Sequence, residues 1–281
     1  MQPDPGVGRF AGRPSPGALL VFDFDGTLWR GDDPLDCYAE LVSLGLDPAE
    51  RAPFLADVHA FLSGDHWSVS GLEPPPDDGW AAIAAFAAAR GESAAHRQAA
   101  FLETRRRIAA GEFPLEVPGG LREFLAASRD SCAVVLASNS PAASVHPVLD
   151  RLGLTPFFDD VASDAGKPDR LPEVVDSWIT VYRPAHVMSI GDHYRNDIAP
   201  AVRRGWFTTY ISPWRWVPGP CSVVGATMED VLPGLYAWVR AVRGAVEQQE
   251  PGVGEAVRSR QAAIPAPTWG RDPGKEVDRT A

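Results

Sequence analysis

The stretch Val21-Phe22-Asp23-Phe24-Asp25-Gly26-Thr27-Leu28 joins a strand-like apolar run to two aspartates. The apolar run begins at residue 18 and has the length and character of a buried strand. Residues two apart in an extended chain point the same way, so Asp23 and Asp25 reach one spot while the phenylalanines face the opposite side. Gly26 permits a tight turn directly afterwards. The stretch therefore predicts a strand, Ala18–Asp23, that ends in two carboxylates.

Four further apolar runs have strand length and alternate with helix-like patterns. They span Cys132–Ala137, Val161–Ser163, His186–Gly191 and Phe207–Ile211. Between them, apolar residues recur at helical spacing in 119–129, 144–152 and 171–180. This alternation predicts an α/β fold with a Rossmann-like parallel sheet covered on both faces. In such sheets ligands bind at the carboxyl ends of the strands.

The first two strands are separated by far more chain than a strand–helix–strand unit needs. The interval runs from Asp23 to Cys132, whereas such a unit takes about 30 residues. The surplus, residues 31–116, has apolar residues at helical spacing, as at Phe54, Val58 and Phe61. We therefore predict an all-helical cap inserted after the first strand, over the carboxyl edge of the sheet.

The remaining chain divides into a core and two tails. Residues 18–30 and 117–244 form the predicted α/β core. Residues 1–17 are rich in proline and glycine, and residues 245–281 mix charge, proline and glycine without periodicity. Such composition predicts a disordered N-terminal arm and a disordered C-terminal tail.

Composition and charge argue against several classes of partner. The net charge is −11, from 26 basic and 37 acidic residues, so the chain lacks the basic footprint of a nucleic-acid binder. No apolar run approaches the roughly 18 residues of a membrane span, and no signal-peptide pattern is present. The three cysteines, Cys37, Cys132 and Cys221, are widely spaced and indicate buried reduced thiols. We expect a cytoplasmic protein with no nucleic-acid or membrane partner, and the oligomeric state stays open.

Polar residues follow the second, third and fourth strands as well. Ser138 and Asn139 come after the second strand, Lys167 after the third, and Asp192 and Asp197 after the fourth. A hydroxyl and free backbone N–H groups at a helix start favour an anion. Carboxylate oxygens suit Mg²⁺, which keeps positions for water and substrate phosphate. Asn139 orients the nucleophile or phosphate, or only caps a helix; the sequence leaves both open.

Together these residues indicate phosphoryl transfer at the edge of the sheet. Asp23 is the candidate nucleophile, because a carboxylate splits hydrolysis into two displacements through an aspartyl-phosphate. Asp25 could protonate the leaving group and later activate water. Mg²⁺ and Lys167 would keep Asp23 ionised beside a phosphate dianion.

The four segments resemble, in order and spacing, the four motifs of the haloacid dehalogenase (HAD) superfamily, over residues 18–240. The motifs are Asp23-Phe24-Asp25-Gly26-Thr27, Ser138 after an apolar strand, Lys167-Pro168, and Gly191-Asp192 with Asp197. The resemblance implies Asp23 as nucleophile, Asp25 as acid/base, and Ser138 and Lys167 as phosphate binders. It also implies a Mg²⁺ site formed by the Asp23 carboxylate, the Asp25 backbone carbonyl and Asp192, with Asp197 in a supporting role. The insertion resembles the helical type-1 (C1) cap of the phosphatase-like branch, whose closure would exclude water and contact substrate.

The expected function is that of a Mg²⁺-dependent phosphatase acting on a small phosphorylated metabolite. A phosphomutase on the same scaffold, or a catalytically idle interaction protein, remains an alternative. Asp25 argues against a dehalogenase, because that branch usually lacks an acid at this position. The sequence has no lysine before Lys167, which argues against a phosphonatase with a Schiff-base lysine in its cap. No cap residue identifies the substrate.

Two charged segments have more than one interpretation. For Arg105-Arg106-Arg107 we favour a solvated helix face, with Glu103 paired to Arg107 at i,i+4, over a clamp for substrate phosphate. His193, Tyr194 and Arg195 either touch substrate or form a solvent-facing loop.

Overall fold

The computed structural model describes residues 15–64, 76, 78–213 and 217–247. The predicted arm and tail therefore lie almost wholly outside the described residues. The last helix, α10 (Met228–Glu247), continues past residue 244, where the core was expected to end. Within the described part of the chain, no helix combines the length and apolarity needed to cross a membrane.

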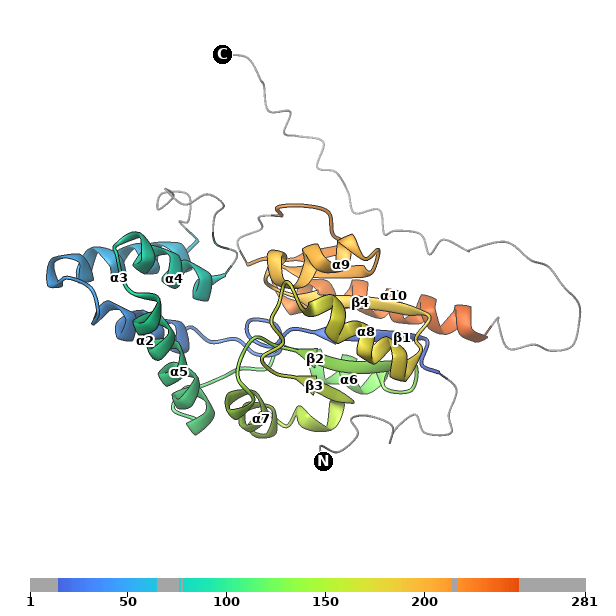
Figure 1. Ribbon diagram of the computed structural model, residues 1–281. Coiled ribbons are helices and arrows are strands. Elements are labelled where there is room, and N and C mark those ends of the chain that lie inside the picture. The colour runs from blue at the N-terminus through green and yellow to red at the C-terminus, as the bar shows by residue number, and fades with distance from the viewer. Residues whose placement is uncertain (1–14, 65–75, 77, 214–216, 248–281) are drawn as a thin grey trace, which may run out of the picture.

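A six-stranded parallel sheet forms the centre of the core (Figure 1). The strand order is β3-β2-β1-β4-β5-β6, which confirms the predicted Rossmann-like α/β class. The strands are β1 (Ala18–Phe22), β2 (Cys132–Ala137), β3 (Asp160–Ala162), β4 (His186–Gly191), β5 (Phe207–Ile211) and β6 (Val223–Gly225).

The register of the three central strands brings their carboxyl ends level. Phe22, the last residue of β1, pairs with Leu136 of β2 and with Ile190 of β4. The residues that follow these strands therefore emerge at one edge of the sheet. This alignment positions the site described below.

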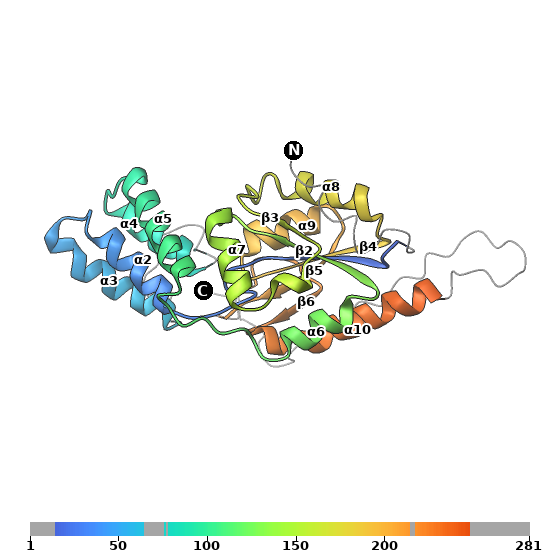
Figure 2. The same ribbon diagram turned by 90° about the horizontal axis from the view of Figure 1, so that it is seen from below.

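Helices cover both faces of the sheet, as expected for parallel strands. In Figure 2, α8 (Leu171–Tyr182) and α9 (Ala199–Arg203) lie on one side, and α6 (Leu121–Ser128) and α10 lie on the other. Side chains of β1 alternate between two apolar clusters: Leu20 and Phe22 join the cluster under α6 and α10, while Leu19 and Val21 pack against α8. Burial on both faces explains the continuous apolar sequence of the strand. Helix α7 (Ala142–Arg151) follows β2.

The insertion after β1 folds into four helices with an apolar core of their own. They are α2 (Asp33–Ser43), α3 (Pro48–Leu62), α4 (Gly79–Ala89) and α5 (Ala94–Ala110). Val42, Phe54 and Ile83 are fully buried in their cluster. Asp78 starts α4 by accepting a 2.6 Å hydrogen bond from Ala81 N, an N-cap of the usual kind. We call residues 31–116 the cap.

The chain leaves and re-enters the core at two adjacent positions. Arg30 N donates to Glu116 O at 2.9 Å, and Glu116 N donates back to Arg30 O at 3.0 Å. The Arg30 guanidinium also lies 3.2 Å from Glu229 at the start of α10. This backbone pair, the hinge pair, joins the cap to the sheet at one place.

The strand boundaries show where the sequence pattern was incomplete. The predicted bounds of β2, β4 and β5 are correct. Strand β1 ends at Phe22, one residue earlier than expected, and β3 begins and ends one residue earlier than expected. Strand β6 was missed, because three residues on an edge are too few for periodicity to be recognised.

Candidate active site

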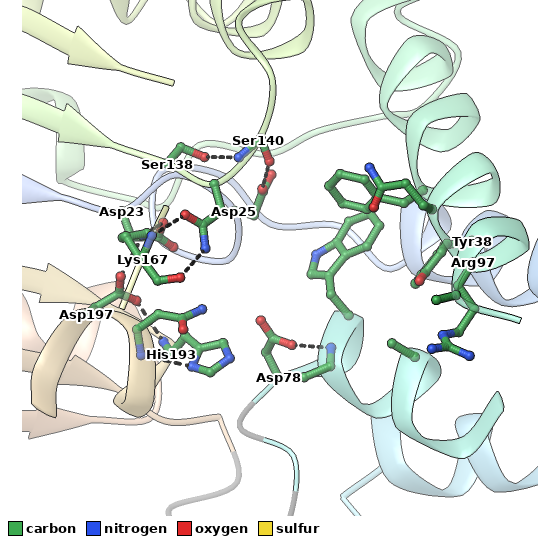
Figure 3. Close-up of a pocket in the computed structure, with 18 residues that line it drawn as sticks. Asp23, Asp25, Tyr38, Asp78, Arg97, Ser138, Ser140, Lys167, His193 and Asp197 are labelled. Atoms are coloured by element: carbon green, nitrogen blue, oxygen red, sulfur yellow. Dashed lines mark hydrogen bonds and ion pairs between the residues drawn. The ribbon is translucent and has the colours of Figure 1, made fainter. Parts of the chain in front are cut away.

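A pocket of about 550 Å³ lies between the carboxyl edge of the sheet and the cap. Figure 3 shows Asp23, Asp25, Ser138, Lys167 and Asp197 on the sheet side, facing Tyr38 and Arg97 of the cap. All seven line the pocket. Trp80, Gln98 and Phe101 complete much of the cap wall. The residues predicted from separate motifs therefore meet in one cavity, apart from Asp192.

Lys167 joins Asp23 and Asp197 in a buried charge cluster. Its Nζ donates to Asp23 Oδ1 at 2.5 Å and to Asp197 Oδ1 at 2.6 Å, and its side chain is only 4% exposed. Burial opposes the charged form of Lys167, but the carboxylates of Asp197 and Asp23 outweigh it and raise its pKa above the usual range. Lys167 is therefore a fixed cation beside the candidate nucleophile.

Asp192 lies close to Asp23 and against the turn at Gly26. Gly26 has φ +73°, and a Cβ there would lie 2.0 Å from Asp192 Oδ2, so only glycine lets the turn pass this carboxylate. Burial, and then the neighbouring carboxylates led by Asp23, raise the pKa of Asp192 well above its ordinary value. Burial likewise raises the pKa of Asp23, with Lys167 opposing the shift.

These carboxylates form a group that fits a divalent cation. Asp23, Asp192 and Asp197 each present an oxygen within 4.8 Å of the other two. When all are ionised, three negative charges face the single positive charge of Lys167, so two negative charges are left uncompensated. A divalent cation balances this excess, and carboxylate oxygens are the ligands of a hard cation. Asp197 is engaged by protein donors at both oxygens, Lys167 Nζ and His193 N, which suits a supporting role.

Ser138 and Asn139 follow β2 as predicted, with different tasks. Ser138 is buried, and its Oγ accepts a 3.0 Å hydrogen bond from Ser140 N. The Asn139 side chain binds the backbone of Lys167 at both ends, with Oδ1 accepting from Lys167 N at 2.7 Å and Nδ2 donating to Lys167 O at 2.9 Å. Asn139 thus holds the loop that carries the lysine, and its contact with phosphate stays a prediction.

Asp25 is held by one residue from the core and one from the cap. Ser140 Oγ donates to Asp25 Oδ2 at 2.7 Å, and Arg105 Nη1 donates to Asp25 Oδ1 at 2.8 Å. Arg105, on helix α5, is 1% exposed. The expectation of a solvated face was wrong for Arg105, since the helix turns this residue into the interface between the cap and the core.

The other two arginines of the run behave as expected. Arg107 Nε donates to Glu103 Oε1 at 2.8 Å at i,i+4, and Arg106 pairs with the same glutamate. Arg106 is exposed, whereas Arg107 is half-buried and its Nη1 also lies 3.7 Å from Cys37 Sγ on α2. The predicted Glu103–Arg107 pair is therefore confirmed.

The segment after Asp192 divides between the pocket and the surface. His193 lines the pocket, whereas Tyr194 OH donates to Pro220 O at 3.0 Å and Arg195 is exposed. Tyr194–Ile198 forms a π-helical turn, a local irregularity found often at functional sites. This turn brings Asp197 back beneath Lys167.

The comparison with known families agrees with this geometry. The family model of haloacid dehalogenase-like hydrolases matches residues 18–204, which include all four motifs and the whole cap. The chain belongs to this family. A search of curated proteins found no match.

Solved structures of other HAD-like hydrolases share the fold at low sequence identity. A HAD hydrolase named YfnB from Bacillus subtilis, bound to magnesium, is 17% identical; the match covers 79% of this chain and 100% of that one, with a TM-score of 0.52. A protein from Haemophilus somnus 129PT, described as a predicted phosphoglycolate phosphatase, is 15% identical over 76% of this chain and 96% of that one, with a TM-score of 0.51. Dehalogenases also occur among the similar structures, such as one from Pseudomonas syringae pv. tomato DC3000 at 19% identity, with 79% and 98% coverage and a TM-score of 0.46.

The cap was expected to contact substrate, but the individual cap residues of this HAD-like site were not predicted. Arg105 pairs with Asp25, and Tyr38, Arg97 and Gln98 line the pocket. The sequence did indicate that Arg105 is buried. Phe101 lies four residues before it and Ile108 three residues after it, so all three share one face of α5. A charged residue within an apolar stripe indicates a buried partner.

Proposed function

We propose that this HAD-like hydrolase is a Mg²⁺-dependent phosphatase that acts on a small phosphorylated metabolite through an aspartyl-phosphate. The observation that carries the proposal is the pair of carboxylates in the pocket. Asp23 is held by Lys167, and Asp25 is held separately by Ser140 and Arg105. Displacement of a halide requires no proton donor beside the nucleophile, whereas release of a basic alkoxide from a phosphate ester does.

In the first step, a carboxylate oxygen of Asp23 forms a bond to phosphorus as the ester P–O bond breaks. Asp25 gives its proton to the leaving oxygen, and the alcohol departs. Lys167, with an ammonium group 2.5 Å from Asp23 Oδ1, lies where the charge of the phosphoryl oxygens develops. Ser138 also lines the pocket, and its hydroxyl is expected to bind the same oxygens.

In the second step, Asp25 takes a proton from water, whose oxygen attacks phosphorus. The bond between phosphorus and Asp23 breaks, inorganic phosphate is released, and both carboxyl groups return to their starting states. Each Asp25 oxygen accepts one hydrogen bond and keeps a further lone pair for this exchange. One carboxyl group thus serves both steps.

A divalent cation would be held by Asp23 and Asp192, with Asp197 in support. Mg²⁺ would supply positive charge next to the phosphoryl group and orient it for in-line attack. The magnesium bound to the Bacillus subtilis structure supports this choice. The cap limits the pocket to about 550 Å³, which favours a small soluble substrate.

An assay with a panel of esters tests the proposal directly. We expect the purified chain with Mg²⁺ to release phosphate from p-nitrophenyl phosphate and, faster, from some small metabolite phosphates, and to release no halide from 2-haloacids. Analysis of the products distinguishes hydrolysis from transfer within a sugar phosphate. Absence of phosphate release across the panel would favour the idle interaction protein.

Mg²⁺ is expected to stabilise the fold in a pH-dependent way. The pKa of Asp192 is raised from its ordinary 3.8, so without metal its contribution to stability is full below that value and is lost as pH rises through the raised pKa. Mg²⁺ at 100 times its Kd adds about 2.7 kcal/mol, roughly 5–10 °C in melting temperature. Differential scanning fluorimetry should show this shift at pH 7.5 and its decline toward pH 4.5.

The variant Asp192→Asn provides the control for this metal effect. Its metal-free form should melt above the wild-type chain at pH 7.5, because one carboxylate has been removed from the group of three. Added Mg²⁺ should then shift its melting temperature by a small fraction of the wild-type change. Equal shifts in both proteins would place the metal elsewhere.

A further inference from the structure

Arg105 is a charged cap residue buried completely at the boundary with the core. Its side chain is among the largest of the fully buried ones in the described chain. Arginines are rarely buried unless they are paired, because desolvation of the guanidinium is costly. The partners of Arg105 therefore indicate why the chain retains it.

The guanidinium connects α5 of the cap with two elements of the core. Nη1 donates to Asp25 Oδ1 at 2.8 Å, and Nε donates to Ser144 Oγ at 3.0 Å on helix α7. Ser140 binds the other oxygen of the same carboxylate at 2.7 Å. The Asp25 carboxylate is thus held at both oxygens, and one of the two donors belongs to the cap.

Aromatic rings surround the guanidinium of Arg105, whereas the Asp25 side chain stays 18% exposed to the pocket. The guanidinium carbon lies 5.6 Å from the centroid of the Trp80 ring and 5.9 Å from those of Phe24 and Phe101, within the range of cation–π contacts. Trp80 and Phe101 are cap residues, whereas Phe24 lies between the two motif aspartates. In such surroundings the hydrogen bonds are stronger than in water, so the carboxylate has little freedom to rotate.

We propose that Arg105 is a positioning residue, supplied by the cap, that holds Asp25 in the orientation for proton exchange with the leaving group and with water. The inference rests on the proposed function, because it takes Asp25 as the acid/base. A direct role as a phosphate clamp does not fit, since the guanidinium is 1% exposed and is directed at Asp25 and Ser144. If Arg105 only stabilised the contact between cap and core, any carboxylate could serve as its partner. Its partner is instead Asp25, the candidate acid/base.

The dependence of rate on the leaving group tests the proposal. Phenoxide is a much more basic leaving group than p-nitrophenoxide and depends more on a proton from Asp25. Arg105→Gln should therefore lower kcat/KM, which reports the steps up to phosphoryl transfer to Asp23, by about 10²-fold for phenyl phosphate and by less than about fivefold for p-nitrophenyl phosphate. Hydrolysis of the aspartyl-phosphate is common to both esters, so any loss in that step lowers both kcat values. Arg105→Lys should recover part of the loss, because it restores the charge without the planar fork.

A double-variant cycle shows whether Arg105 acts through Asp25. In the Asp25→Asn background, Arg105→Gln should cost almost nothing further, because the carboxylate it positions is absent. Arg106→Gln is the matched control: its side chain is one position along the same helix, exposed, and paired with Glu103. We expect Arg106→Gln to leave both rates unchanged.

Folding is followed by circular dichroism at the assay temperature, and Ser144→Ala serves as a milder second variant. Ser144→Ala removes only the bond to Arg105 Nε and should lower the phenyl phosphate rate about threefold. Equal losses of kcat/KM for the two esters, or additive losses in the double variant, would overturn the positioning role while the phosphatase function stands. If the wild-type chain hydrolyses neither ester, the proposed function itself fails, and the role of Arg105 with it.

Discussion

Replacing Asp23 by asparagine is expected to lower phosphate release by at least about 10⁴-fold, the scale seen when a nucleophile is removed. The change keeps the shape of the side chain and leaves an oxygen to accept the 2.5 Å hydrogen bond from Lys167. The amide, however, does not attack phosphorus. The loss should therefore appear in kcat, measured as inorganic phosphate released per enzyme from p-nitrophenyl phosphate.

The intermediate gives this prediction a second readout. Wild-type protein quenched in acid during turnover should carry one phosphoryl group on the peptide that contains Asp23, and hydroxylamine should remove it, as expected of an acyl phosphate. The Asn variant should carry none. Asp130→Asn, at an exposed position, is the matched control and should behave as wild type. A rate within tenfold of wild type in the Asp23 variant would exclude this carboxylate as the nucleophile.

Replacing Lys167 by methionine should impair both stability and turnover. The Lys167 side chain is 4% exposed, and its Nζ lies 2.5 Å from Asp23 Oδ1 and 2.6 Å from Asp197 Oδ1. Without it the two carboxylates face each other and Asp192 in a buried site. Removal of one member of a buried ion pair costs about 3–5 kcal/mol of unfolding free energy. Chemical denaturation at pH 7.5 should show a loss of this size, and kcat should fall about 10²–10³-fold.

The pH dependence separates this electrostatic effect from a loss of packing. The pKa of Asp23 and that of Asp192 are already raised in the wild-type chain, and loss of the cation raises that of Asp23 further. The unfolding free energy of Lys167→Met should therefore recover as pH falls and the carboxylates take up protons. Arg203→Met, at an exposed position, is the control for loss of a positive charge. A deficit that does not change with pH would mean that Lys167 acts by packing alone.

The sequence was sufficient for the part of the site that lies on the sheet. Ser138, Lys167 and Asp192 each follow a strand, and parallel strands in register present their ends at one edge. The sequence motifs and the strand order therefore place these residues at the same edge of the sheet. The fold class and the bounds of three strands, β2, β4 and β5, follow from the same alternation of apolar runs.

The contribution of the cap could not be derived in this way. Which face of α5 meets the core depends on packing among four helices, and the run Arg105-Arg106-Arg107 is equally charged at every position. The pairs of Arg106 and Arg107 with Glu103 are local, and helical spacing alone is enough to predict them. The contact between Arg105 and Asp25 joins residues 80 positions apart, and only the tertiary structure specifies it.

The hinge pair of Arg30 and Glu116 has a consequence for how such enzymes diversify. Because the chain departs and returns at neighbouring backbone positions, the cap is attached at one point and carries its own apolar core. Segments of this kind are readily inserted, exchanged or lost during evolution without disturbing the host fold. The charges on the sheet can then stay the same while a new cap changes the choice of substrate. Arg105 is the exception, because it pairs with Asp25 across the boundary between cap and core. A replacement cap that is to keep this contact must supply a new partner for Asp25.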